Sequence, residues 1–127
     1  MIYGIGNDLI EISRVKKIIS KNHGDRFVNR ILTTQEKNIY LERGKNRVEF
    51  LAGRFAAKEA IVKALGCGIG KHIGFQDINI VPNSLGKPVC NISSDIVNKL
   101  GIKSEVKLHI SITHSDTMAA AFAVIEI

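Results

Sequence analysis

Two acidic side chains and one lysine have the types and spacing to bind a metal ion and a phosphate. Glu59 and Lys63 are four residues apart in the strongly helical run 50–66, so both project from the same side of the helix. Asp8 follows an apolar segment near the N-terminus, where a strand is expected to end. Asp8 and Glu59 would offer the oxygen ligands that suit Mg²⁺, and Lys63 could neutralise a bound phosphate. The spacing also fits an ordinary Glu59–Lys63 surface pair, and taken alone it favours a simple turn or cap aspartate at position 8.

A histidine is a further candidate for ligand binding. His114 lies in the expected turn 114–116 between two strands. A turn histidine is commonly just exposed to solvent. A role in phosphate binding requires that this turn face Asp8 and Glu59.

The glycine clusters do not form a nucleotide-binding fingerprint. Gly4 and Gly6 lie in the opening strand, but Leu9 stands where the GxGxxG pattern needs its third glycine. The glycines at 66, 68 and 70 follow a helix and are expected to end it, and no GxxxxGK[ST] loop is present. We interpret Gly4 and Gly6 as positions where the backbone approaches a neighbouring element closely.

Size and composition predict a globular protein of one domain, residues 1–127. Hydrophobic residues make up 45% and charged residues 24% of the chain. The N-terminus lacks the pattern of a signal peptide, and no apolar run approaches the ~18 residues of a transmembrane helix. Cys67 and Cys90 lack CxxC spacing, which favours two reduced thiols. We therefore expect a cytoplasmic protein without a membrane partner.

The net charge of +6 is concentrated in the first half of the chain. Residues 14–30 contain six basic side chains and one acid, Asp25. Such a patch can orient an acidic partner, although it also fits a solvated helix face. Nucleic-acid binding is the main alternative suggested by this charge. Against it, aromatic residues are only 6% of the chain, there is no Trp, and no recognition motif is present.

Periodicity and turn residues predict an α+β protein with helices mainly first. The predicted strands are 2–6 with its exit 8–12, then 77–81, 88–92, 106–113 and 118–127. The predicted helices begin near residue 11 and then span 25–32, 33–42, 46–66 and 95–100. Thr33 with Glu36, and Asn46 with Glu49, have the spacing of capping boxes at two of the helix starts.

Several segments together resemble one family. They are GIGNDLIEISR at 4–14, RFVNRILTTQE at 26–36, EFLAGRFAAKEAIVKALG at 49–66, FQDINI at 75–80, NSLGKP at 83–88 and SITHSDTMAAAFAVIE at 111–126. In this order they resemble the holo-acyl-carrier-protein synthases, the small bacterial-type 4′-phosphopantetheinyl transferases. The resemblance implies the fold of that family, a small antiparallel sheet packed with a long central helix and N-terminal helices.

The resemblance also implies roles for individual residues. Asp8 and Glu59 match the two Mg²⁺-binding acids, and Lys63 matches the lysine that contacts the coenzyme A phosphates, so that Glu59 and Lys63 are the expected catalytic residues. The other expected coenzyme A contacts are Arg54 and Lys58 on the same helix, the adenine-binding turn (Asn83, Gly86, Lys87 and Pro88), and His114 contributed across a subunit interface. For Arg54 and Lys58 a purely structural role is left open beside the coenzyme A contact. Arg14, Arg26 and Arg30 match basic positions that dock the acidic carrier protein.

The implied reaction is transfer of 4′-phosphopantetheine from coenzyme A to a serine of apo-acyl carrier protein. It releases adenosine 3′,5′-bisphosphate and supports fatty acid biosynthesis, and the family forms homotrimers with active sites between subunits. The base for the serine proton is left open between Glu59 acting through water, a metal-bound hydroxide and an acid of the carrier. A small Mg²⁺-dependent phosphohydrolase using Asp8 and Glu59 is a further alternative.

Overall fold

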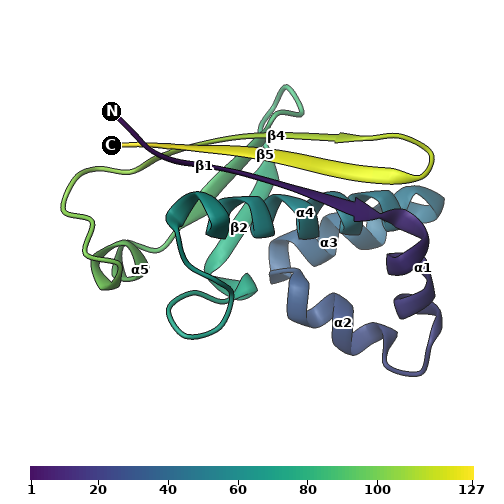
Figure 1. Cartoon of the computed structure of the whole chain (residues 1–127). Helices are drawn as coiled ribbons and strands as arrows, with labels where there is room; N and C mark the ends of the chain where they lie inside the picture. The colour runs from purple at the N-terminus through teal and green to yellow at the C-terminus, as the bar shows by residue number, and fades with distance from the viewer.

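The structure is a computed structural model that describes all residues, 1–127, with five helices and five strands (Figure 1). In chain order the elements are β1 (Ile2–Glu11), α1 (Ile12–Ser20), α2 (Gly24–Ile31), α3 (Thr34–Glu42), the 3-10 turn η1 (Gly44–Asn46), α4 (Arg47–Leu65), the 3-10 turn η2 (Phe75–Asp77), β2 (Ile78–Pro82), β3 (Pro88–Ile92), α5 (Ser94–Lys99), β4 (Lys107–His114) and β5 (Met118–Glu126). No helix has both the length and the apolar character needed to cross a membrane.

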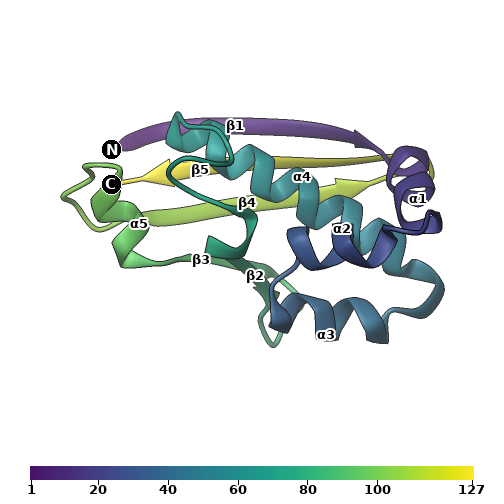
Figure 2. The ribbon, with the colours of Figure 1, turned by 90° about the horizontal axis from the view of Figure 1, so that it is seen from below.

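The strands form two antiparallel sheets around the long helix α4. One sheet has the strand order β1-β5-β4, and the other is the β2–β3 hairpin. Helix α4 runs across one face of the three-stranded sheet, with α1, α2 and α3 grouped around the end where α4 begins (Figure 2). This arrangement confirms the predicted α+β class, with a small antiparallel sheet packed on a long central helix.

Helix α4 is the centre of the hydrophobic core. Of its 19 residues, 13 are buried, so almost its whole circumference is covered by other elements. Its first turns pack with the three N-terminal helices, and its later turns pack with β5 and β2. Because the helix is held on all sides, its buried polar side chains, Arg54 and Lys58, are fixed in position.

The two glycines of β1 let this strand lie directly on the backbone of α4. A Cβ atom added at Gly4 would overlap the carbonyl oxygen of Ala64, and one added at Gly6 would overlap the carbonyl oxygen of Ala60. The close approach expected from the sequence is therefore confirmed. The close contact between β1 and α4 also places Asp8, the next residue of β1 that faces inward, beside α4.

We expect the variant Gly6→Ala to lower the free energy of unfolding by about 3 kcal/mol, because the added methyl group must push β1 away from α4. Urea denaturation measures this change. Gly68→Ala is the matched control, since a Cβ at Gly68 meets no atom within 4 Å. Equal unfolding midpoints for the two variants would show that β1 does not lie this close to α4.

Of the two predicted capping boxes, only one forms. The Thr33 backbone N–H donates to Glu36 Oε1 over 2.8 Å, and the Glu36 N–H donates to the Thr33 hydroxyl. At α4, the side chain of Asn46 caps nothing. The Asn46 backbone N–H instead donates to the Arg43 carbonyl over 3.1 Å within η1. The prediction of a second box is wrong, because this 3-10 turn uses the donor that Glu49 would need.

The opening strand is longer than predicted. Residues 2–11 form one continuous strand, and its pairing with β5 extends from Ile2 to Glu11 without a break near residue 7. Helix α4 ends as predicted at Gly66, whose φ of 78° lies in the left-handed region. The turn between β2 and β3 also forms as predicted.

Candidate functional site

Asp8 and Lys63 meet between β1 and α4. Lys63 Nζ lies 3.0 Å from Asp8 Oδ1 and also donates to the Asn7 carbonyl over 3.0 Å. The Asp8 side chain is 17% exposed and that of Lys63 is 52% exposed, so the lysine can leave this contact for a ligand. The surface pair between Glu59 and Lys63 that the spacing allowed is not formed, since Lys63 pairs with Asp8 instead.

Glu59, one turn before Lys63 on α4, is a second partly buried acid near Asp8. Burial raises the pKa of Glu59, and the negative charge of Asp8 raises it further, while Lys63 and Arg30 oppose the shift. The two carboxylates are therefore close enough to repel each other, as the sequence hypothesis of a shared site requires.

This pair of carboxylates fits a Mg²⁺ ion better than a softer metal. No group of three or more His, Cys, Asp or Glu side chains that could hold a metal is present. Mg²⁺ is commonly held by one or two carboxylates, with water and phosphate oxygens as the other ligands. A divalent cation would also remove the repulsion between Asp8 and Glu59.

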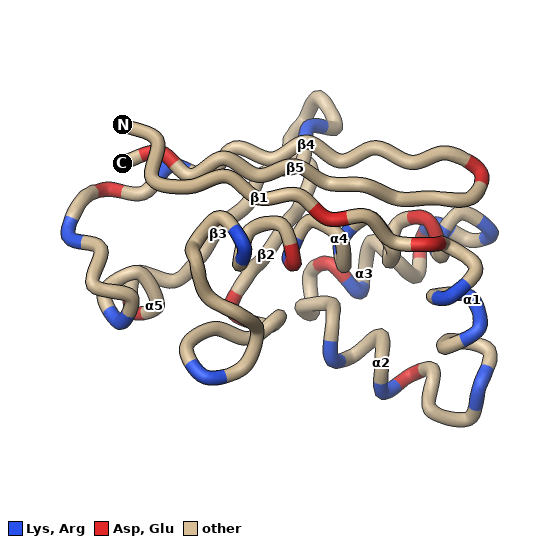
Figure 3. Tube along the Cα trace, viewed as in Figure 1, with Lys and Arg blue, Asp and Glu red and all other residues tan.

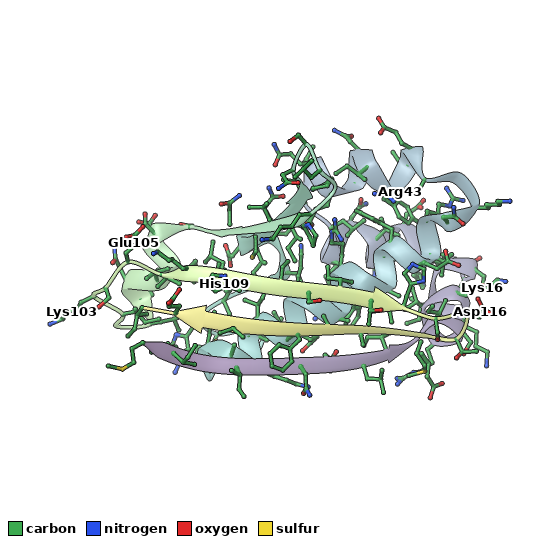
Figure 4. The ribbon with its side chains drawn as sticks, turned by 90° about the horizontal axis from the view of Figure 1, so that it is seen from above. Lys16, Arg43, Lys103, Glu105, His109 and Asp116 are labelled. Atoms are coloured by element: carbon green, nitrogen blue, oxygen red, sulfur yellow. The ribbon has the colours of Figure 1, made fainter.

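Asp8 and Lys63 line an open cavity of about 590 Å³. Its other walls include Ser111, Thr113 and Phe122, which belong to the exposed alternation of β4 and β5. This outer face of the sheet is not crossed by any helix (Figure 4). The candidate site thus opens onto an uncovered surface.

Arg54 and His114 line a second cavity, of about 660 Å³. Gly86 and Pro88 of the predicted adenine-binding turn belong to the same cavity, together with Arg43. This cavity brings together, within one chain, four of the residues that the resemblance assigned to coenzyme A.

Arg54 is fixed by its surroundings. Its Nε donates to the Ile80 carbonyl over 3.1 Å, and its guanidinium lies 4.4 Å from the centre of the Phe50 ring. Burial lowers the pKa of Arg54 to about 10, so the side chain remains a cation at neutral pH. Arg54 is therefore a rigid positive wall of the second cavity.

Asp8 and Glu59, with Lys63 beside them, are called the acidic group below. The acidic group and the residues of the second cavity lie on different sides of the molecule. Arg54 and Lys63 are nine residues apart on α4, which places them about 13 Å apart along the helix axis and on opposite sides of it. Asp8 belongs to the edge strand β1 and His114 to the other edge strand, β4. Arg43 lies beyond the β4 edge of the sheet (Figure 4). One chain thus does not join the acidic group and the second cavity into one site.

Lys58 lies in the core and not in a coenzyme A site. Its side chain is wholly buried, and Nζ donates to Glu36 Oε1 over 2.6 Å and to the carbonyls of Ile31 and Phe75 over 2.7 and 3.0 Å. The expected coenzyme A contact is wrong for Lys58 in this structure, because all three donors are used inside the core. Glu36 also accepts from the Ile80 N–H over 2.6 Å, so the pair ties α3, α4 and β2 together.

The rest of the predicted adenine turn is shaped by Asn83. Its side-chain oxygen accepts from the backbone N–H groups of Leu85 and Lys87 over 2.9 and 3.0 Å, and Gly86 has a φ of 84°. Asn83 and Lys87 do not line the second cavity. Asn83 fixes the turn, while Lys87 is exposed beside it.

The predicted docking arginines lie on α1 and α2. Arg14, Arg26 and Arg30 are all exposed, and Lys and Arg positions follow both helices in Figure 3. Arg30 is close enough to Glu59 for its charge to oppose the rise in the pKa of that acid. Arg30 is therefore the docking arginine that lies near Glu59.

Sequence reasoning missed the charged residues Arg43, Glu49 and Asp116 of the second cavity. Arg43 had no distinguishing pattern. Glu49 did have one, but its spacing from Asn46 was interpreted as a helix cap.

Comparison with known proteins agrees with the resemblance. The sequence profile of the 4′-phosphopantetheinyl transferase superfamily matches residues 4–123. A holo-[acyl-carrier-protein] synthase of Geobacillus sp. (strain WCH70) is 44% identical over 127 residues, which cover 99% of this chain and 98% of the relative.

Solved structures give the same result. A holo-(acyl-carrier-protein) synthase from Bacillus anthracis str. Ames, in complex with CoA (3′,5′-ADP), is 42% identical with a TM-score of 0.83, covering 98% of this chain and 96% of that one. The enzyme from Neisseria meningitidis is 39% identical with a TM-score of 0.86, and each chain is covered completely. The chain therefore belongs to the holo-acyl-carrier-protein synthase family of the 4′-phosphopantetheinyl transferase superfamily.

Proposed function

We propose that this chain, as one domain of residues 1–127, transfers 4′-phosphopantetheine from coenzyme A to a serine of apo-acyl carrier protein. The products are holo-acyl carrier protein and adenosine 3′,5′-bisphosphate, and the role is cytoplasmic, in fatty acid biosynthesis. The observation that carries the proposal is the meeting of Asp8, Glu59 and Lys63 between β1 and α4. It occurs in a chain 44% identical to a holo-[acyl-carrier-protein] synthase along its whole length.

Asp8 and Glu59 would hold Mg²⁺. When bound, the ion would supply positive charge to the pyrophosphate of coenzyme A. Lys63, half exposed and held only by Asp8 and the Asn7 carbonyl, is free to turn toward the leaving phosphate and offset its growing charge. For the serine proton we propose Glu59 as the base, acting through a bound water, with a metal-bound hydroxide and an acid of the carrier as the alternatives.

The second cavity suits the nucleotide half of coenzyme A. Arg43, Arg54 and His114 give it positive or protonatable side chains for phosphate groups, and Gly86 and Pro88 give it a narrow turn for the base. Since this cavity and the acidic group lie on opposite sides of one chain, we propose that neighbouring copies join them.

The outer face of the three-stranded sheet supports association of copies as a homotrimer. Ile5, Leu9 and Phe122 are 62%, 63% and 46% exposed on it. Apolar side chains gathered on one open face are typical of surfaces that another chain covers. Asp8 and Lys63 line a cavity that is open to the same face, so a copy packed there can complete the site.

Mass spectrometry of apo-acyl carrier protein incubated with the enzyme, coenzyme A and Mg²⁺ tests the proposed reaction. We expect the carrier to gain the mass of phosphopantetheine, and the gain to disappear with EDTA. Release of phosphate from coenzyme A without carrier modification would support a phosphohydrolase instead. Retention on DNA at ~150 mM salt would revive nucleic-acid binding.

The basic surface of α1 and α2 is proposed to bind the acidic carrier. We expect Arg14→Glu to raise the KM for the carrier roughly tenfold at low salt while leaving the KM for coenzyme A unchanged, because Arg14 is exposed and lines neither cavity. The difference should shrink as salt rises and screens the charges. Steady-state kinetics over a salt series measures both constants.

Lys99→Glu is the matched control for this prediction. Lys99 is an exposed lysine at the end of α5, away from the basic helices. Equal carrier KM values for the two variants would remove Arg14 from the docking surface.

A further inference from the structure

Glu49 contains the one buried side-chain oxygen or nitrogen atom without a hydrogen-bond partner in this structure. The atom is Oε2, and none of the three ion pairs of the chain includes Glu49. A buried acceptor without a donor is unfavourable, because the oxygen loses its water and gains nothing in exchange. Such an atom calls for a physical explanation.

The two glutamates at the third position of a helix show how this oxygen is left free. Glu36 at the start of α3 is used completely, by Thr33, Lys58 and Ile80. Glu49 has the same spacing from Asn46, but the Asn46 N–H donates to Arg43 within η1. The carboxylate of Glu49 is therefore not consumed by helix capping.

Glu49 lines the 660 Å³ cavity together with Arg43, Arg54, His114 and a second acid, Asp116. It also lines a smaller neighbouring cavity with Lys16 and Lys45. A carboxylate repels phosphate, so the phosphate groups belong beside the basic side chains, and the part of the nucleotide that suits Glu49 is a neutral donor of the nucleoside. The nucleotide half of coenzyme A has such donors at two places, the exocyclic amine of adenine and the ribose 2′-hydroxyl. Either donor could pair with the Glu49 carboxylate, whose buried Oε2 would have to turn toward the cavity to accept the hydrogen bond.

We propose that Glu49 is a specificity-determining residue, which accepts a hydrogen bond from one neutral donor of the nucleoside and so selects coenzyme A among phosphorylated ligands. The inference rests on the proposed function, because it assumes that the second cavity receives the nucleotide. A site with an unpaired acceptor discriminates strongly against a ligand that lacks the matching donor.

Isothermal titration calorimetry with adenosine 3′,5′-bisphosphate tests the proposal. Three ligands are compared: the bisphosphate itself, its 2′-deoxy analogue, and the purine analogue without the 6-amino group. Each is titrated into the wild type, Glu49→Ala, Glu49→Gln and the control Glu42→Ala, an exposed glutamate at the end of α3. Circular dichroism is used to check that each variant is folded.

We expect Glu49→Ala to weaken the natural bisphosphate about ten- to hundredfold, the range of a hydrogen bond to a charged group. Glu49→Gln keeps an acceptor oxygen and should recover much of the affinity. For one analogue only, the one that lacks the recognised donor, wild type and Glu49→Ala should bind equally, and this analogue identifies the donor.

Two results would overturn the inference. Equal losses for all three ligands would mean that Glu49 only supports the local structure. No loss for any ligand would mean that the oxygen faces no donor. Both leave the proposed reaction standing, whereas failure of the wild type to bind the natural bisphosphate would count against the proposed function itself.

Discussion

Replacing Glu59 with glutamine is expected to lower the turnover number about a thousandfold, because the amide can neither bind Mg²⁺ well nor accept the serine proton. The same change is expected to leave the melting temperature equal or higher. Burial and the charge of Asp8 raise the pKa of Glu59, so its charged form costs stability at neutral pH. That cost is lost as the pH falls through the folded-state pKa, and a neutral amide removes it at every pH.

This pair of opposite effects separates a catalytic role from a structural one. Transfer is measured by carrier modification, and stability is measured by thermal denaturation as a function of pH. Glu42→Gln is the matched control, an exposed glutamate that should change neither quantity. A wild-type rate in Glu59→Gln would remove this residue from the site. A large fall in melting temperature would point to a structural role.

Mixing two inactive variants is expected to restore activity, if the acidic group and the second cavity come from different copies. One variant is Glu59→Gln, and the other is the double variant Arg43→Ala with His114→Ala, which removes an arginine and a histidine from the second cavity. In randomly mixed trimers with sites between neighbours, about one quarter of the interfaces combine two intact halves. We therefore expect about a quarter of the wild-type rate from an equal mixture, compared with almost none from either variant alone.

The control mixture combines Glu59→Gln with Lys63→Ala. Both changes lie in the same half of the site, so no interface is restored by mixing them. Subunits are exchanged by joint unfolding and refolding, and light scattering reports the mass of the assembly. Failure of the first mixture to exceed the control would place the complete site in one chain, and a monomer in light scattering would reject the trimer.

The open outer face of the sheet connects the two predictions. Asp8 and Lys63 lie beside it, and the exposed Ile5, Leu9 and Phe122 are the residues that a neighbouring copy would cover. Catalysis and assembly would then use one surface, so that a chain in isolation would have neither a covered sheet nor a complete coenzyme A site.

Several parts of this protein could be predicted from local sequence because their physical causes are local. A glycine ends α4, and Thr33 with Glu36 forms a capping box that needs only neighbouring residues. The placement of Gly4 and Gly6 predicted a close approach, since only residues without a side chain allow it. The positions of the secondary elements followed from periodicity in the same way.

Other parts failed because one pattern permits different tertiary surroundings. Asn46 with Glu49 has the spacing of a capping box, but a preceding 3-10 turn takes the N–H that the box needs. The opening strand did not break near residue 7, because its hydrogen bonds to β5 continue to Glu11. Neither η1 nor the pairing partner of β1 is visible in a local pattern.

The sequence by itself determined which residues have chemistry to offer: an acid after an opening strand, an acid and a lysine on one helix, and a family resemblance along the chain. Only the tertiary structure decided how the lysines and acids are used. Lys58 and Lys63 lie on the same helix, yet the core surrounds Lys58 and its partner Glu36, whereas β1 brings Asp8 to Lys63 at the surface. Spacing fixes the direction of a side chain from its helix, but segments distant in the chain decide whether that direction leads into the core or to a ligand.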